Sequence, residues 1–69
     1  MTDQHAAIAA RIADVERRMR NFPTNDPAMY GLAHARKEWS HNLPACDAVA
    51  SRDLDRCDFY LRQLEGSKP

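Results

Sequence analysis

The feature that most constrains this chain is the spacing of a mostly apolar stripe near its start. Over residues 3–22 the stripe recurs at intervals of 3, 4, 3, 4 and 3 residues, at His5, Ile8, Ile12, Val15, Met19 and Phe22. Alternating steps of three and four are the period of an α-helix with one buried face. Asp3 suits the start of such a helix, and the arginines near residue 20 suit its negative end. The sequence therefore predicts a helix over 3–22 that packs against other helices.

Two further helices are predicted after this one. Pro23 stops the first helix, and Asp26-Pro27 is a typical helix start, with the acid at the cap and the proline at the first helical position. We predict a second helix over 27–42 and a third over 44–65, with a frayed end at 67–69. The stripe of the second helix is Ala28, Leu32, Ala35, Trp39 and Leu43, and that of the third includes Leu54, Cys57, Leu61 and Leu64.

The junction at Pro44 leaves two architectures open. Proline removes a backbone donor and clashes with the preceding turn, so the chain must kink or break there, and Asn42 could cap a new helix. A break gives a compact three-helix bundle, whereas a kink gives one long arm on which the first helix folds back. In either case we predict an all-α fold, a small helical hairpin or bundle. We expect homodimerisation to complete its core, because the core is small and the third helix is longer than the first can cover.

Composition narrows the function classes. Ten acidic and ten basic residues give a formal charge of zero, which argues against a dedicated nucleic-acid binder. The start lacks the pattern of a signal peptide, and no run approaches the roughly 20 apolar residues of a membrane span. We therefore expect a soluble, cytoplasmic protein. Cys46 and Cys57 on one helix would lie about 16 Å apart, too far for a disulfide, so we predict reduced, largely buried thiols.

One face of the second helix suggests a metal site as an alternative. His34, Glu38 and His41 fall within about 60° on an ideal helix, and Glu38-x-x-His41 has the spacing with which di-iron bundles hold a metal. This spacing resembles that of short ferritin-like proteins that assemble a di-metal site between two hairpins, with Glu16 as a further carboxylate. The other interpretation, which we adopt, is a solvated polar face, and we predict no cofactor.

An aromatic residue in the third helix lies away from its apolar stripe. Phe59 sits about 160° from Leu61 on a helical wheel, on the side that carries Arg52, Arg56 and Gln63, with Tyr60 between this side and the stripe. Aromatic residues ringed by arginines are typical of interface hot spots. We predict that Phe59 contacts either a partner protein or another helix of this chain or its dimer mate.

No catalytic constellation or phosphate-binding loop can be placed in the sequence. We therefore predict a non-enzymatic module that binds and regulates, or inhibits, a larger protein, as small phage and mobile-element proteins of this size often do. The predicted contact residues are Arg52, Arg56, Phe59, Tyr60 and Gln63. The predicted core or dimer stripe is Ile8, Ile12, Val15, Met19, Leu54, Leu61 and Leu64. A weak nucleic-acid-binding regulator that uses Arg17-Arg18-Met19-Arg20 is a second alternative.

Overall fold

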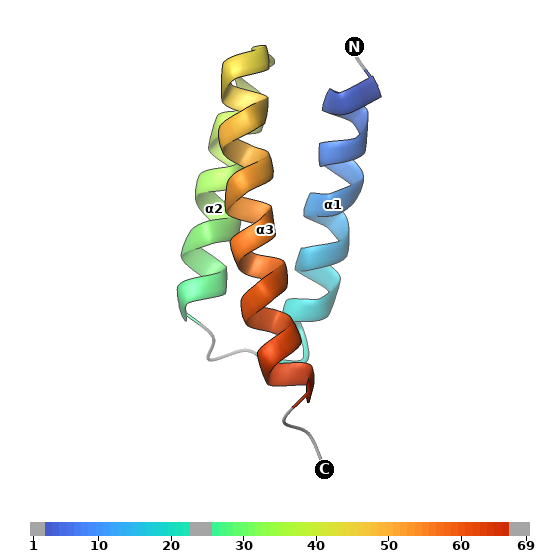
Figure 1. Ribbon diagram of the computed structural model, residues 1–69, viewed down its shortest axis with the longest axis vertical. Coiled ribbons are helices and arrows are strands. Elements are labelled where there is room, and N and C mark those ends of the chain that lie inside the picture. The colour runs from blue at the N-terminus through green and yellow to red at the C-terminus, as the bar shows by residue number, and fades with distance from the viewer. Residues whose placement is uncertain (1–2, 23–25, 67–69) are drawn as a thin grey trace.

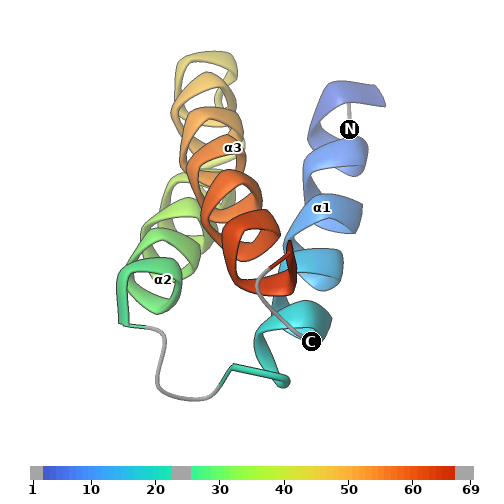
Figure 2. The same cartoon turned by 60° about the horizontal axis from the view of Figure 1, so that its bottom comes forward.

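The protein is an up-down-up bundle of three helices. A computed structural model describes residues 3–22 and 26–66 of the 69, and within them α1 spans Asp3–Met19, α2 spans Asp26–Ser40 and α3 spans Pro44–Gly66. Figures 1 and 2 show α1 and α3 running in the same direction with α2 antiparallel to both. No strand occurs in these described ranges. The all-α class and the compact bundle predicted from the sequence are confirmed.

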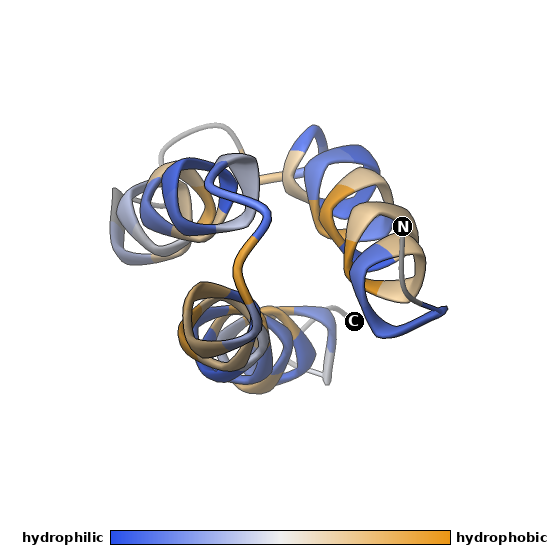
Figure 3. Ribbon diagram, turned by 90° about the horizontal axis from the view of Figure 1, so that it is seen from above, coloured by the Kyte–Doolittle hydropathy of each residue, from blue (hydrophilic) through white to orange (hydrophobic). Residues whose placement is uncertain are grey.

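The predicted stripes form the core of the bundle. Each of the three helices contributes apolar residues to one buried cluster, and the ribbon in Figure 3 alternates hydrophobic and hydrophilic segments along each helix, as amphipathic helices do. Met19 and Leu64, together with Phe22 and Trp39, are only partly buried at the edges of this core. The buried apolar residues are Ile8, Ile12, Val15, Ala28, Leu32, Ala35, Ala50, Leu54, Cys57 and Leu61. One chain therefore buries all but Met19 and Leu64 of the stripe that the sequence assigned jointly to the core and to a dimer.

The first helix ends earlier than the sequence predicts, at Met19 instead of residue 22. The amides of Arg20, Asn21 and Phe22 each donate to a carbonyl three residues earlier, at 3.4, 3.1 and 2.9 Å. Such bonds tighten the final turn of a helix and close it. The role predicted for Pro23 and the fraying predicted for 67–69 lie outside the described residues.

The chain breaks between α2 and α3. α2 ends at Ser40, and Asn42 adopts a left-handed backbone with φ 55°. Its amide donates to the carbonyl of Trp39 at 3.1 Å, an arrangement that terminates a helix. The carbonyl of Leu43 accepts the first bond of α3, from Asp47 at 2.8 Å. The prediction that Asn42 caps α3 is therefore wrong, since it ends α2, and the single kinked arm does not form.

Leu43 is a second correction at this junction. The sequence places it on the apolar stripe of the second helix, but it lies beyond the end of α2 and is exposed. The left-handed turn at Asn42 takes Leu43 off the helical period that would have carried it inward.

α2 packs closely against α3 through a glycine. A Cβ at Gly31 would lie 2.7 Å from the Sγ atom of Cys57, so only glycine fits at this crossing without a shift of its neighbour. The Cys57 thiol donates to the carbonyl of Ala28 at 3.5 Å. Both cysteines are free, which confirms the predicted absence of a disulfide. Cys57 is buried and Cys46 partly so.

None of the helices in the described ranges combines the length and apolar character needed to cross a membrane.

Candidate protein-interaction surface

Phe59 points away from the bundle, as the sequence predicts. Its side chain is 66% exposed, so no other helix of this chain covers it, and the intrachain contact considered from the sequence is wrong. Arg52, Arg56 and Gln63 are also exposed, and Tyr60 is 40% exposed. On an ideal helix Arg56 and Gln63 fall between Phe59 and Tyr60. We call these five residues of α3 the aromatic face.

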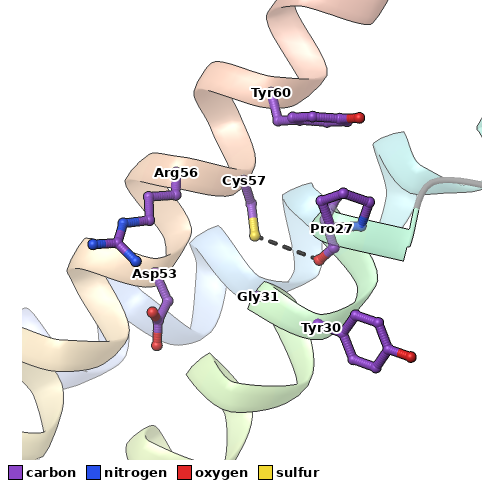
Figure 4. A pocket seen from close by; sticks show the side chains of 8 residues that line it. Pro27, Tyr30, Gly31, Asp53, Arg56, Cys57 and Tyr60 are labelled. Atoms are coloured by element: carbon purple, nitrogen blue, oxygen red, sulfur yellow. Dashed lines mark hydrogen bonds between the residues drawn. The ribbon is translucent and has the colours of Figure 1, made fainter.

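A groove between α2 and α3 adjoins the aromatic face. It encloses about 370 Å³ and is lined by Arg56 and Tyr60 of α3 and by Pro27 and Tyr30 of α2; in Figure 4 the Arg56 guanidinium and the Tyr30 ring lie at its edges, directed away from Gly31. The side chain of Tyr30 is 72% exposed. The lining is completed by Ala28, Gly31, Asp53 and Cys57. Because Arg56 and Tyr60 belong to both features, the groove and the aromatic face form one continuous surface.

The sequence analysis missed the contribution of α2 to this surface. Nothing in the sequence around Tyr30 predicts that it lies beside a groove, and Gly31 indicates only a weaker helix. The recess depends on how α2 lies against α3, which neither residue indicates by itself.

Arg52 and Arg56 differ from the arginines that stabilise the bundle. Neither forms an ion pair with any residue that the structure describes. Asp55 lies between them in sequence, but its Oδ1 atom pairs instead with Nη2 of Arg11 in α1 at 2.6 Å. Asp53, which lines the groove, has its Oδ2 atom 2.5 Å from Nδ1 of His34. The surface therefore carries unmatched positive charge although the chain as a whole is neutral.

Two arginines of the run considered for the nucleic-acid-binding alternative form ion pairs within the bundle. Arg18 donates to Asp58 at 2.7 Å and to both carboxylate oxygens of Glu65 at 2.9 and 3.0 Å. The hydrogen bonds that Arg18 donates to Glu65 and Asp58 raise the pKa of Arg18 above its usual range, and the bond to Asp58 lowers the pKa of that carboxyl. Arg17 pairs with Asp14 within α1. Two of the three arginines in this run are thus already engaged.

The residues of the alternative metal site lie near one another on α2 and are engaged separately. Glu38 lies 3.7 Å from Nε2 of His34 and 3.9 Å from Nε2 of His41, while Nδ1 of His34 faces Asp53. Glu16, the further carboxylate considered, pairs with Arg36. Within residues 3–22 and 26–66, no group of three or more His, Cys, Asp or Glu is arranged to hold a metal ion.

Neither thiol is set up as a nucleophile. Burial raises the pKa of Cys57, with a further contribution from the charge of Asp53. Desolvation and the neighbouring Glu38 raise the pKa of Cys46. An activated cysteine has a lowered pKa, so both side chains stay protonated at neutral pH.

A buried polar cluster at the open end of the bundle was not predicted. His5 and Asp47 are each 4% exposed, and Nδ1 of His5 lies 2.9 and 3.1 Å from the two carboxylate oxygens. Trp39 stacks on His5 with centroids 4.5 Å apart and donates its indole N–H to the carbonyl of His5 at 2.8 Å. The cluster joins all three helices, and because it is shielded from solvent its role is structural.

Comparison with protein-family models, with curated proteins and with solved structures gives no match to this chain.

Proposed function

We propose that this chain is a non-enzymatic module that binds a larger protein through the aromatic face and thereby regulates or inhibits it. The exposure of Phe59 carries the proposal. The chain contains one Trp, two Tyr and two Phe, and both tyrosines and Phe59 are exposed.

Leaving these rings in water has a cost for so small a protein. A chain of this length has a marginal core, and an exposed aromatic contributes nothing to it while raising the risk of aggregation. Aromatic residues and arginine are the types enriched at the centres of protein interfaces. A binding role accounts for both the rings and the unpaired arginines that surround them.

The experiment has two steps. The tagged protein is used to capture its partner from a lysate of the native host, the partner is identified by mass spectrometry, and its dissociation constant is measured with purified components. We expect Phe59→Ala to weaken binding about 30-fold or more, the hot-spot range of about 2 kcal/mol, with an unchanged melting temperature.

Met29→Ala is the matched control. Met29 is also an exposed apolar residue of the bundle, 47% exposed, but it does not line the groove. We expect less than about a threefold effect on binding. Equal losses for Met29→Ala and Phe59→Ala, or none for either, would contradict the proposal.

We also propose, from the small size of the core, that the chain pairs with a second copy at micromolar concentration. Light scattering over a range of concentrations tests this, and a monomer mass throughout would contradict it. A dimer mass that survives Phe59→Ala would leave the aromatic face free for the larger partner. A dimer lost in that variant would place the second copy on this face.

A further inference from the structure

The groove between α2 and α3 has an apolar floor that requires no hydrogen bonds from an occupant. Gly31 packs so closely on Cys57 that a Cβ there would lie 2.7 Å from the sulfur, so position 31 adds no side chain to the floor. The thiol of Cys57 is already engaged with the carbonyl of Ala28. A volume of about 370 Å³ is at the small end of ligand pockets and suits a single large apolar side chain.

Two arginines of α3 lie beside this floor, one helical turn apart. Arg56 lines the groove, and Arg52 lies one helical turn earlier, about 6 Å along the axis. As described above, neither has a carboxylate partner within the described residues, and Asp53 is held by His34. Guanidinium groups bind carboxylates through paired hydrogen bonds.

A second copy of the chain is a poor source of such carboxylates. Every carboxylate whose side chain the structure describes, except that of Asp3, already lies in an ion pair with an arginine or histidine. Apart from Asp3, a second copy that docks on Arg52 and Arg56 would have to break or share one of these pairs.

We infer that the groove takes an acidic segment of the partner protein, with one large apolar side chain seated between Tyr30 and Tyr60 and carboxylates on Arg52 and Arg56. This inference rests on the proposed function, because it names the chemistry of the partner at the same surface. A single-stranded nucleic acid could also combine arginine contacts with stacking on aromatic rings, but the polar edges of a base would find few hydrogen-bond partners on an apolar floor. It is therefore an outcome of the test.

The test uses a random twelve-residue peptide display library selected on the full chain, followed by fluorescence anisotropy with the enriched peptides. We expect these peptides to combine Asp or Glu with a Leu, Phe or Trp. Their affinity should fall at least tenfold with Arg56→Glu, Arg56→Gln or Tyr60→Ala.

Two matched controls and one charge reversal sharpen this result. Lys37→Glu changes an exposed cation of α2 outside the groove, and Met29→Ala removes an apolar side chain outside it; each should change affinity less than twofold. Selection on Arg56→Glu should exchange the acids of the peptides for lysine or arginine. Circular dichroism confirms the fold of each variant.

Three results would overturn the inference: enriched peptides without acids, no peptide whose binding depends on Arg56, or a labelled single-stranded twelve-nucleotide DNA that binds more tightly than any peptide. The proposed function fails separately, when Phe59→Ala keeps full affinity for the captured partner. If binding of the partner depends on Phe59 but the partner contacts the groove with basic or uncharged residues, the proposed function stands. Only the inference of an acidic segment is then overturned.

Discussion

α3 meets its two neighbours in different ways. Toward α1 it presents aspartates that pair with longer side chains of α1, so that His5 meets Asp47, Arg11 meets Asp55, and Arg18 meets Asp58. Toward α2 it meets small residues such as Ala28 and Gly31, and the two helices approach more closely than α1 and α3 do (Figure 1).

This difference explains where the candidate surface lies. The contacts with α1 engage Asp47, Asp55, Asp58 and Glu65 of α3, whereas Asp53 pairs with His34 of α2. The contacts with α2 use small side chains, which leave a recess at their edge and leave Tyr30 and Tyr60 on its rim. Ion pairing of these acids with α1 and α2 thus leaves the arginines beside the groove unmatched.

The largest effect should come from the buried pair between α1 and α3. Asp47→Ala leaves His5 buried without its carboxylate, and we expect a loss of about 3 kcal/mol in the free energy of unfolding. Asp55→Ala is the control on the same helix, because its pair with Arg11 is exposed and should contribute about 1 kcal/mol or less. Urea unfolding followed by circular dichroism measures both. Equal losses would show that burial does not distinguish these pairs.

The close approach of α2 and α3 can be tested with a double-mutant cycle. Gly31→Ala alone should destabilise the protein by about 1–2 kcal/mol, because the added Cβ meets the sulfur of Cys57. In a Cys57→Ala background the same change should stabilise by up to about 1 kcal/mol, since alanine is the better helix former. The same sign in both backgrounds would contradict the proposed clash.

The contacts of α3 with α1 and with α2 also show which features of the structure can be predicted from the sequence alone. The stripes of Ile8, Ile12 and Leu54 follow a strict helical period, and that period is sufficient to predict which faces are buried. Nothing in the sequence relates His5 to Asp47 across 42 positions, because their meeting depends on the register of two helices that are not adjacent in sequence. The exposure of Phe59 was predictable from its angle to Leu61, but the groove beside it requires α2 to be in place.

A smaller effect, dependent on pH, is expected at the other end of α1. The hydrogen bond from Arg18 lowers the pKa of Asp58 below its ordinary value in the folded chain. A lowered pKa stabilises the fold fully above the unfolded value, and this contribution is lost as the pH falls through the folded value. Arg18→Met should therefore cost about 1 kcal/mol at pH 7 and little at pH 2. The loss in the free energy of unfolding is measured by urea unfolding at each pH. An equal loss at both pH values would show that it does not come from the ionised Asp58 carboxylate.

The smallest effect on stability is expected at Phe59, and it tests the central claim that this ring does not serve the fold. The measurement is the free energy of unfolding of Phe59→Ala beside that of Leu61→Ala, two residues away and fully buried. We predict a change within about 0.5 kcal/mol for Phe59→Ala and a loss of about 3 kcal/mol for Leu61→Ala. A loss of 2 kcal/mol or more at Phe59, roughly what burying such a side chain contributes, would contradict the account.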